Sequence, residues 1–296
     1  MGGTGERSAS RREGVEERSL GRALQEYARG IVGGLLFSLP LLYTMEVWWA
    51  GFIARPSILL IYLAAGFLLL FGYNRYAGLH QDASWIDIAF EAVEEMGLGL
   101  LVAAGILWLI GQIDGSMPLS EIVGKVVVEG VTAAIGLSVG AAQLGGGGKS
   151  TGDEQGMRGR EDREDRGLPG EIVLGICGAV LFASNVAPTE EIVHIAIEAT
   201  RWRILGLALL SFALGGIILT HSDFTGSQPV RPGAGLLPIL FRATINYAVA
   251  LVACAFILWF FGRFEGVSLA VGLAETVALG VAGSIGASAG RLLLLT

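Results

Sequence analysis

The sequence predicts an all-α, polytopic membrane protein in which eight transmembrane helices form two four-helix repeats of parallel orientation. The composition is the first reason: the 296 residues are 53% hydrophobic and only 16% charged, with 45 glycines. Such a chain is too apolar for an ordinary soluble domain, and glycine is common in membrane helices. Apolar segments of about 20 residues, the length that crosses a bilayer, recur along the chain. One glycine-rich segment also occurs twice, 150 residues apart.

The chain begins with a polar stretch, residues 1–29, which we predict to be a cytoplasmic tail. No apolar core follows a short basic start, so the stretch does not have the pattern of a secretory signal. Within it, Leu20 to Ala28 has the spacing of an amphipathic helix on the membrane surface, and a mobile tail is the alternative.

Two groups of four apolar segments follow the tail. The first group makes up a repeat over residues 30–144, the second a repeat over 170–296, and a glycine-rich and charge-rich linker, 145–169, joins them. The predicted spans are Ile31–Trp49, Pro56–Tyr73, Ile86–Ile110, Leu119–Leu144, Gly170–Ala187, Ile204–Thr220, Leu237–Phe261 and Leu269–Leu293.

The placement of basic residues predicts the orientation of these spans. Most of the 20 Lys and Arg residues fall in the tail, the linker and the other connections on the same side, which the positive-inside tendency assigns to the cytoplasm. Both termini are therefore expected to be cytoplasmic. Five tryptophans would then lie at the outer interface, where aromatic residues gather: Trp48, Trp49, Trp108, Trp202 and Trp259.

The duplicated segment reads GVTAAIGLSVG at Gly130–Gly140 and GVAGSIGASAG at Gly280–Gly290. Shorter matches extend the similarity at offsets of 151 residues, from Ile106–Trp108 to Ile257–Trp259, and of 145 residues near the start of each half. Four spans in each copy give both copies one orientation, with a pseudo-two-fold axis along the membrane normal. Chance similarity between apolar helices is the alternative.

Each copy of this segment contains a small-xxx-small run, which lets two helix backbones approach closely in lipid. The helix-packing residues predicted from these runs are Gly136, Gly140, Gly286 and Gly290. We expect the fourth and eighth helices to meet at these glycines, across the axis between the two repeats.

Charged residues inside the predicted spans fall at equivalent positions of the two repeats. Glu91 aligns with Arg242, and Lys125 aligns with Glu275. Because a charge in lipid requires a partner, we expect these two intramembrane pairs to form across the axis. Such pairs either fix which helices meet or take part in moving ions, and both interpretations remain open.

The third predicted span begins with an acidic face made of Asp87, Glu91, Glu94 and Glu95. This face is either a solvated rim or the mouth of an acidic vestibule. Glu95 aligns with Asn246, so a polar residue recurs at this position in both repeats. The recurrence favours a polar layer that faces inward.

Oxygen-bearing side chains near the outer ends of the first and fifth spans form a candidate ion path: Glu46, Asn185, Glu190 and Glu191. Together with carbonyls that Pro40 and Pro188 leave free, these groups are hard donors that suit cations or protons. The alternative, which the residue pattern favours, is that Glu190 and Glu191 begin an interfacial amphipathic helix with the sequence TEEIVHIAIEATRW.

The sequence lacks the patterns of an enzyme or a metal site, so we expect no catalytic residues, no cofactor and no metal. Its three histidines are scattered, and Cys177 and Cys254 lie in apolar stretches typical of reduced core residues. Gly145–Ser150 resembles the end of a phosphate-binding loop, but Gln143 stands where that motif needs glycine. No large basic face points to a nucleic acid.

Two segments, LFSLPLLYTMEVWW at Leu36–Trp49 and LFASNVAPTEEI at Leu181–Ile192, resemble a family of uncharacterised prokaryotic integral membrane proteins, catalogued as a domain of unknown function. The resemblance covers nearly everything after the tail. It implies a multi-span protein of the inner (plasma) membrane, and it carries over no known activity and no site residues.

The architecture favours a cation or proton transporter or channel, with the lipid bilayer and a small cation or proton as partners. A non-transporting membrane scaffold or accessory subunit is the alternative. An enzyme that acts on lipid is a third and weaker hypothesis, since no convergent acid and nucleophile are visible. The oligomeric state is left open.

Overall fold

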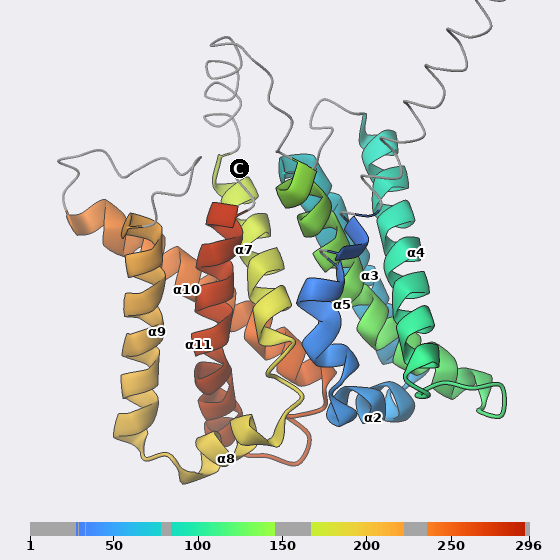
Figure 1. Ribbon diagram of the computed structural model, residues 1–296. Coiled ribbons are helices and arrows are strands. Elements are labelled where there is room, and N and C mark those ends of the chain that lie inside the picture. Colours follow the sequence, from blue (N-terminus) through green and yellow to red (C-terminus); the bar gives the residue numbers. More distant parts are fainter. Residues whose placement is uncertain are drawn as a thin grey trace, which may run out of the picture.

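The computed structural model describes residues 28, 30–32, 34–77, 84–145, 167–221 and 236–293, and these residues form helices joined by turns and loops (Figure 1). The helices are Gly30–Leu42, α2 (Met45–Ile53), α3 (Pro56–Ala77), α4 (Trp85–Leu109), α5 (Leu119–Gly145), α7 (Gly167–Ala183), α8 (Glu190–Glu198), α9 (Arg201–His221), α10 (Leu236–Phe260) and α11 (Leu269–Leu293). The all-α prediction is confirmed for this part of the chain. The predicted tail and linker, with the segment that resembles a phosphate-binding loop, lie almost wholly outside the described residues.

Six of these helices are long and apolar enough to cross a membrane: α3, α4, α5, α9, α10 and α11. The helix Gly30–Leu42 and α2 bring the number to seven only if the bent pair counts as one span. The α7 helix, with 17 residues, is shorter than the roughly 20 that cross a bilayer. The prediction of eight transmembrane helices is therefore not confirmed.

The first predicted span is interrupted, and the fifth ends earlier than predicted. In the first, the chain bends by 85° between Gly30–Leu42 and α2, because Thr44 adopts an extended backbone with φ −104° and ψ 114°. The Thr44 hydroxyl donates to the carbonyl of Pro40, which completes the end of the first helix. The fifth, predicted to reach Ala187, ends as α7 at Ala183, and a turn leads to α8. A hydropathy window does not register the break before α2, because both of its flanks are apolar.

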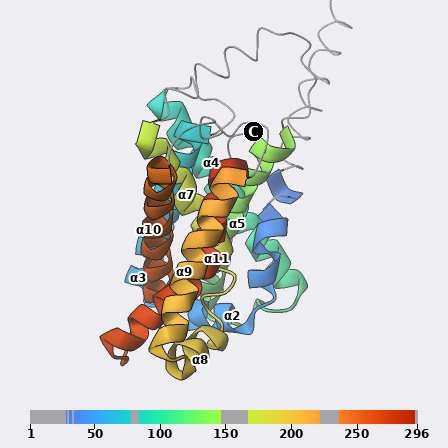
Figure 2. The ribbon, with the colours of Figure 1, turned by 90° about the vertical axis from the view of Figure 1, so that its left-hand side faces the viewer.

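The short helices α2 and α8 lie across the same end of the helical assembly in two perpendicular views (Figures 1 and 2). The connections from α4 to α5 and from α10 to α11 are also at this end, which we call the α2/α8 end. The predicted amphipathic helix that begins at Glu190 is confirmed as α8: Ile192 and Ala196 are buried, whereas His194 and Glu198 are exposed.

The helices pack in two groups, each around its last long helix. Helix α5 packs against α2, α3 and α4, and α11 packs against α7, α8, α9 and α10. Helix α7 also contacts α3 and α5 and so joins the groups. Among the candidate spans α5 is the most enclosed, with 78% of its apolar window buried, which suits a helix that other helices surround.

The glycine runs of α5 and α11 were expected to meet each other, and they do not. Gly136 of α5 instead faces Gly34 of the helix Gly30–Leu42, where an added Cβ would lie 3.2 Å from the Gly34 Cα. On α11, a Cβ on Gly290 would lie 2.8 Å from the Cα of Gly178 in α7, and Gly286 also packs on Gly178. Gly140 is buried. In each group the glycines thus allow the first helix to pack closely on the last.

Helices α4 and α10 end in the same way. Gly111 and Gly262 follow them with φ values of 75° and 70°, the left-handed conformation that glycine adopts without steric cost. The next backbone N–H donates five residues back in both cases, from Gln112 to Leu107 and from Arg263 to Leu258. This Schellman-type ending satisfies carbonyls at the helix end and directs the chain toward the following helix.

Candidate functional site

The Glu129 carboxylate lies in the middle of α5, in the interior of the helical assembly. Its side chain is 0% exposed, and neither carboxylate oxygen has a hydrogen-bond partner within the described part of the chain. An ionised carboxylate buried in this way is costly unless a proton or a cation neutralises it. Glu129 was not among the site residues predicted from the sequence, although a single Glu inside the apolar run 126–131 is a usable signal.

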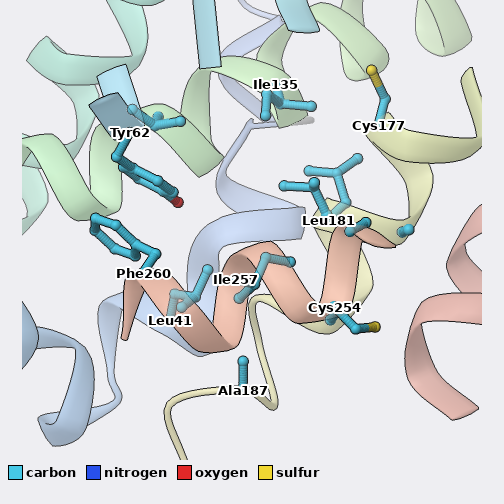
Figure 3. Packing of buried hydrophobic residues seen from close by; sticks show 14 of the residues in the cluster. Leu41, Tyr62, Ile135, Cys177, Leu181, Ala187, Cys254, Ile257 and Phe260 are labelled. Carbon is cyan, nitrogen blue, oxygen red and sulfur yellow. The ribbon is translucent and has the colours of Figure 1, made fainter. Parts of the chain in front are cut away.

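The neighbours of Glu129 lie where the two groups of helices meet. One turn along α5, the Thr132 hydroxyl shares a hydrogen bond of 3.2 Å with the hydroxyl of Tyr62, and the Glu129 carboxylate interacts electrostatically with Tyr62. The Tyr62 ring in turn stacks on Phe260 of α10, with centroids 3.9 Å apart (Figure 3). Glu129 therefore lies beside a contact between the first and second groups.

A second polar cluster joins α3, α4 and α5. The amide of Asn74 donates to Glu95 Oε2 at 2.7 Å, and the Ser138 hydroxyl donates to Asn74 Oδ1 at 2.9 Å. Asn74 is 1% exposed and Ser138 is 2% exposed, so this is an internal network. In the second group, Asn246 is buried and donates to Ser288 Oγ at 2.9 Å. The predicted inward-facing polar layer with Glu95 and Asn246 is confirmed.

The rest of the predicted acidic face is less enclosed. Asp87 and Glu94 are exposed, and Glu91 is half-buried. Asp87 belongs to a capping box, because its carboxylate accepts from Ser84 while the Ser84 hydroxyl accepts from the Asp87 backbone N–H. Asp87 and Glu94 accordingly lie at the surface where α4 begins, whereas Glu95 joins the internal network through Asn74.

The predicted pair between Lys125 and Glu275 is not formed. The Lys125 ammonium donates to Glu121 of its own helix at 2.6 Å and to the Gln112 carbonyl at 3.0 Å. Glu275 is 0% exposed, and its two oxygens have no hydrogen-bond partner among the described residues. Its electrostatic neighbour is Arg263, whose guanidinium donates to the carbonyl of Pro188.

Glu91 and Arg242 are not brought together either. Figure 1 shows the first turns of α4 and α10 on opposite sides of the assembly, and Arg242 is exposed. The physical reason is the packing described above: α7 lies between the groups, so equivalent positions of the two groups face different neighbours.

The four residues of the predicted ion path lie at the α2/α8 end and do not converge on one site. Glu46 is half-buried in the first turn of α2, whereas Glu190 and Glu191 are exposed at the start of α8. Asn185 donates to the carbonyls of Leu181 at 2.6 Å and of Phe37 at 3.3 Å, which ties α7 to the helix Gly30–Leu42.

Glu191 also has the wrong electrostatics for a proton carrier. A hydrogen bond from its own backbone N–H lowers the pKa of this exposed carboxyl below its ordinary value. The group is therefore held in its ionised form at neutral pH, as an acidic residue at a helix N-terminus commonly is.

A cavity of about 260 Å³ opens at the α2/α8 end between α2 and the beginning of α5. Its lining combines three aromatic rings with one amide and one ion pair: Trp48, Trp49, Phe52, Gln112, Glu121 and Lys125. We call it the outer cavity, because the placement of basic residues in the sequence predicts that this end lies on the outer side of the membrane. Trp48 and Trp49 were predicted to lie at this level, but no association with Lys125 was predicted.

Comparison with known families gives one match. The model of the family described as "Putative integral membrane protein (DUF2391)" matches residues 26–294, which is nearly the whole chain and includes every helix discussed above. No curated protein and no solved structure matches the chain. The resemblance inferred from Leu36–Trp49 and Leu181–Ile192 is thereby confirmed.

Proposed function

The chain belongs to the DUF2391 family of integral membrane proteins, and from that premise we propose that it moves protons or small cations across the inner membrane, without an enzymatic role. The observation that carries the proposal is Glu129, a fully buried carboxylate with no hydrogen-bond partner within the described residues. In lipid, ionisable groups of this kind mark ion paths and proton relays, because a purely structural role would not justify their cost.

The position of Glu129 within α5 supports this function. Buried polar side chains follow one another along one face of α5 at Lys125, Glu129 and Thr132. At 1.5 Å per residue they extend over roughly 10 Å, about a third of the thickness of a bilayer core. Each has a different neighbour, so the series offers successive places at which a proton or cation can be held.

Flux measurements in proteoliposomes test the proposal. An imposed potential is expected to drive proton or cation entry into vesicles that contain the full chain, and Glu129→Gln is expected to reduce the rate at least about tenfold by removing the ionisable group. Glu198→Gln is the matched control, because the Glu198 side chain is 77% exposed on α8. Wild-type flux no faster than that of protein-free vesicles would refute transport and favour the scaffold alternative.

We further propose that the two groups of helices arose by duplication of one unit, which consists of a first helix, a short flat helix and three long helices. The starts of α2 and α3 precede those of α8 and α9 by 145 residues, and α4 and α5 precede α10 and α11 by 151 and 150. The two Schellman-type endings lie 151 residues apart, and Gly136 and Gly286, which lie 150 residues apart, each pack on a glycine in the first helix of their group. Corresponding helices also point in the same direction in Figure 1, as a parallel repeat requires.

Cysteine labelling tests the proposed orientation, with both termini in the cytoplasm. Gly115→Cys and Glu198→Cys place thiols at the α2/α8 end, whereas Leu168→Cys places one at the opposite end. A membrane-impermeant maleimide added to intact cells should label the first two and spare the third. The unsubstituted chain is the control, because Cys177 and Cys254 are free but buried. Labelling of Leu168→Cys alone would show that the orientation is the opposite of the one proposed.

A further inference from the structure

The outer cavity has a volume of about 260 Å³, slightly below the 300–1,000 Å³ that is typical of sites for drug-sized ligands. It therefore suits a small group, such as the polar head of a larger molecule. Helix α2 forms one wall with Trp48, Trp49 and Phe52, and the start of α5 with the preceding loop forms the other.

The two walls are held together by direct backbone contact. Gly51 of α2 packs on Gly124 and Lys125, and a Cβ added to Gly51 would lie 2.7 Å from the Lys125 Cα. The indole N–H of Trp48 donates to the Leu42 carbonyl at 3.1 Å, which fixes the orientation of this ring. The aromatic wall is thus preorganised against the ion pair, and a ligand would not have to order it.

Both members of the ion pair in the cavity, Lys125 and Glu121, can take a further polar partner. Lys125 is only 7% exposed, and its third donor contact, to Met117 Sδ at 3.9 Å, goes to a weak acceptor that a stronger anion can replace. On the other side, Glu121 uses Oε1 for Lys125, and its side chain lines the cavity and is 19% exposed, so the carboxylate can accept a further donor. The faces of tryptophan rings additionally attract cations.

We propose that the outer cavity binds a zwitterionic group in which an anionic phosphate is joined to an ammonium by a short linker. The phosphate lies against the Lys125 ammonium, and the ammonium lies against Glu121 and the aromatic wall. A ligand with a single charge would leave one member of the ion pair poorly compensated, whereas a zwitterion compensates both. The head group of a phosphatidylethanolamine-type lipid and a free phosphoethanolamine share this chemistry.

The aromatic wall is not a requirement of the fold. If the proposed duplication is correct, the positions of the three rings on α2 are occupied on α8 by side chains that do not form an aromatic wall. These side chains are Val193, His194 and Ile197, in place of Trp48, Trp49 and Phe52. The second unit therefore folds around a flat helix without these rings. Ile197 is 65% exposed and Phe52 is 58% exposed, so truncations at the two positions form a matched pair.

The experiment uses the purified full chain in detergent and measures binding by native mass spectrometry. The probes are dihexanoyl phosphatidylethanolamine, dihexanoyl phosphatidylglycerol and phosphoethanolamine without acyl chains. We expect one saturable molecule of a zwitterionic probe per chain, bound at least about tenfold more tightly than phosphatidylglycerol, since a lost charge-assisted bond is worth about that factor. Glu121→Gln and Phe52→Ala should each weaken this binding by at least a similar factor, and Ile197→Ala should leave it unchanged.

The outcomes separate the two sources of the ligand. Equal binding with and without acyl chains identifies a free zwitterion, and binding only of the lipid identifies a membrane lipid. Equal affinities of the unsubstituted chain for phosphatidylethanolamine and phosphatidylglycerol would overturn the proposal. So would equal affinities of the Phe52→Ala and Ile197→Ala variants for the zwitterionic probe. Because Phe52 is exposed, its truncation keeps the test valid even if Glu121→Gln does not fold.

Discussion

Replacing Gly178 by valine is expected to force α7 away from α11 and to lower the free energy of unfolding by at least about 3 kcal/mol. A Cβ at this position would lie 2.7 Å from the Cα of Gly290, a contact that real Cβ atoms do not make. The obstacle is backbone, which cannot rotate away as a side chain can. The cost should therefore reach the upper end of the ~1–3 kcal/mol that overpacking usually brings. Thermal unfolding of the detergent-solubilised protein measures it.

Gly206→Val on α9 is the matched control for this substitution, because nothing lies within 4 Å of a Cβ added at Gly206. Its melting temperature should stay close to that of the unsubstituted chain. Gly286→Val should lower the free energy of unfolding by a similar amount to Gly178→Val. The double variant should lose less free energy than the two single variants together, since the two glycines share one contact. Equal melting temperatures of Gly178→Val and Gly206→Val would show that α7 and α11 do not pack in this way.

Replacing Glu129 by leucine is expected to stabilise the fold and to abolish flux. The carboxylate has no described hydrogen-bond partner, so its removal takes away a desolvation cost of about 1–3 kcal/mol and leaves no other polar group unsatisfied. Leucine also fits the architecture, because Leu279 occupies the corresponding position of α11 and is 0% exposed. Thermal unfolding and proteoliposome flux, measured on the same preparation, check the two parts.

Glu95→Leu provides the contrast, because it removes a carboxylate that accepts a hydrogen bond of 2.7 Å from Asn74. This variant leaves the buried Asn74 amide without its acceptor and should lower the melting temperature, the opposite of Glu129→Leu. A destabilised Glu129→Leu would mean that the carboxylate contributes to the fold, and undiminished flux would remove Glu129 from the transport mechanism.

The long helices were predictable from residue type because their apolar runs have clear ends. The predicted span Leu269–Leu293 coincides with α11, and Leu119–Leu144 differs from α5 by one residue. The flat helix α2 was not predictable from hydropathy alone, since it is as apolar as a spanning segment, whereas the amphipathic pattern after Glu190 did predict α8. The signals that distinguish α2 are local ones, the extended backbone at Thr44 and the carbonyl of Pro40 that its hydroxyl caps.

The candidate site was harder to predict, because an alignment of two similar segments predicts which positions correspond and does not predict which side chains touch. Lys125 and Glu275 occupy corresponding places beside Gln112 and Arg263, yet each belongs to a separate group of helices. A search for matched charges also passes over Glu129, whose counterpart is Leu279. Glu95 was correctly expected to face inward because its counterpart, Asn246, is polar too.

The crossing of Gly34 on Gly136 has a consequence for biosynthesis. The two residues are separated by ~100 positions, so at ordinary rates of translation the first helix waits roughly 5 to 20 s before α5 leaves the ribosome. During that interval its glycine face has no protein to cover it and is left to lipid or to the insertion machinery. Synthesis thus leaves the glycine face of the first helix without its protein partner until α5 is made, before α7 and the rest of the second group follow.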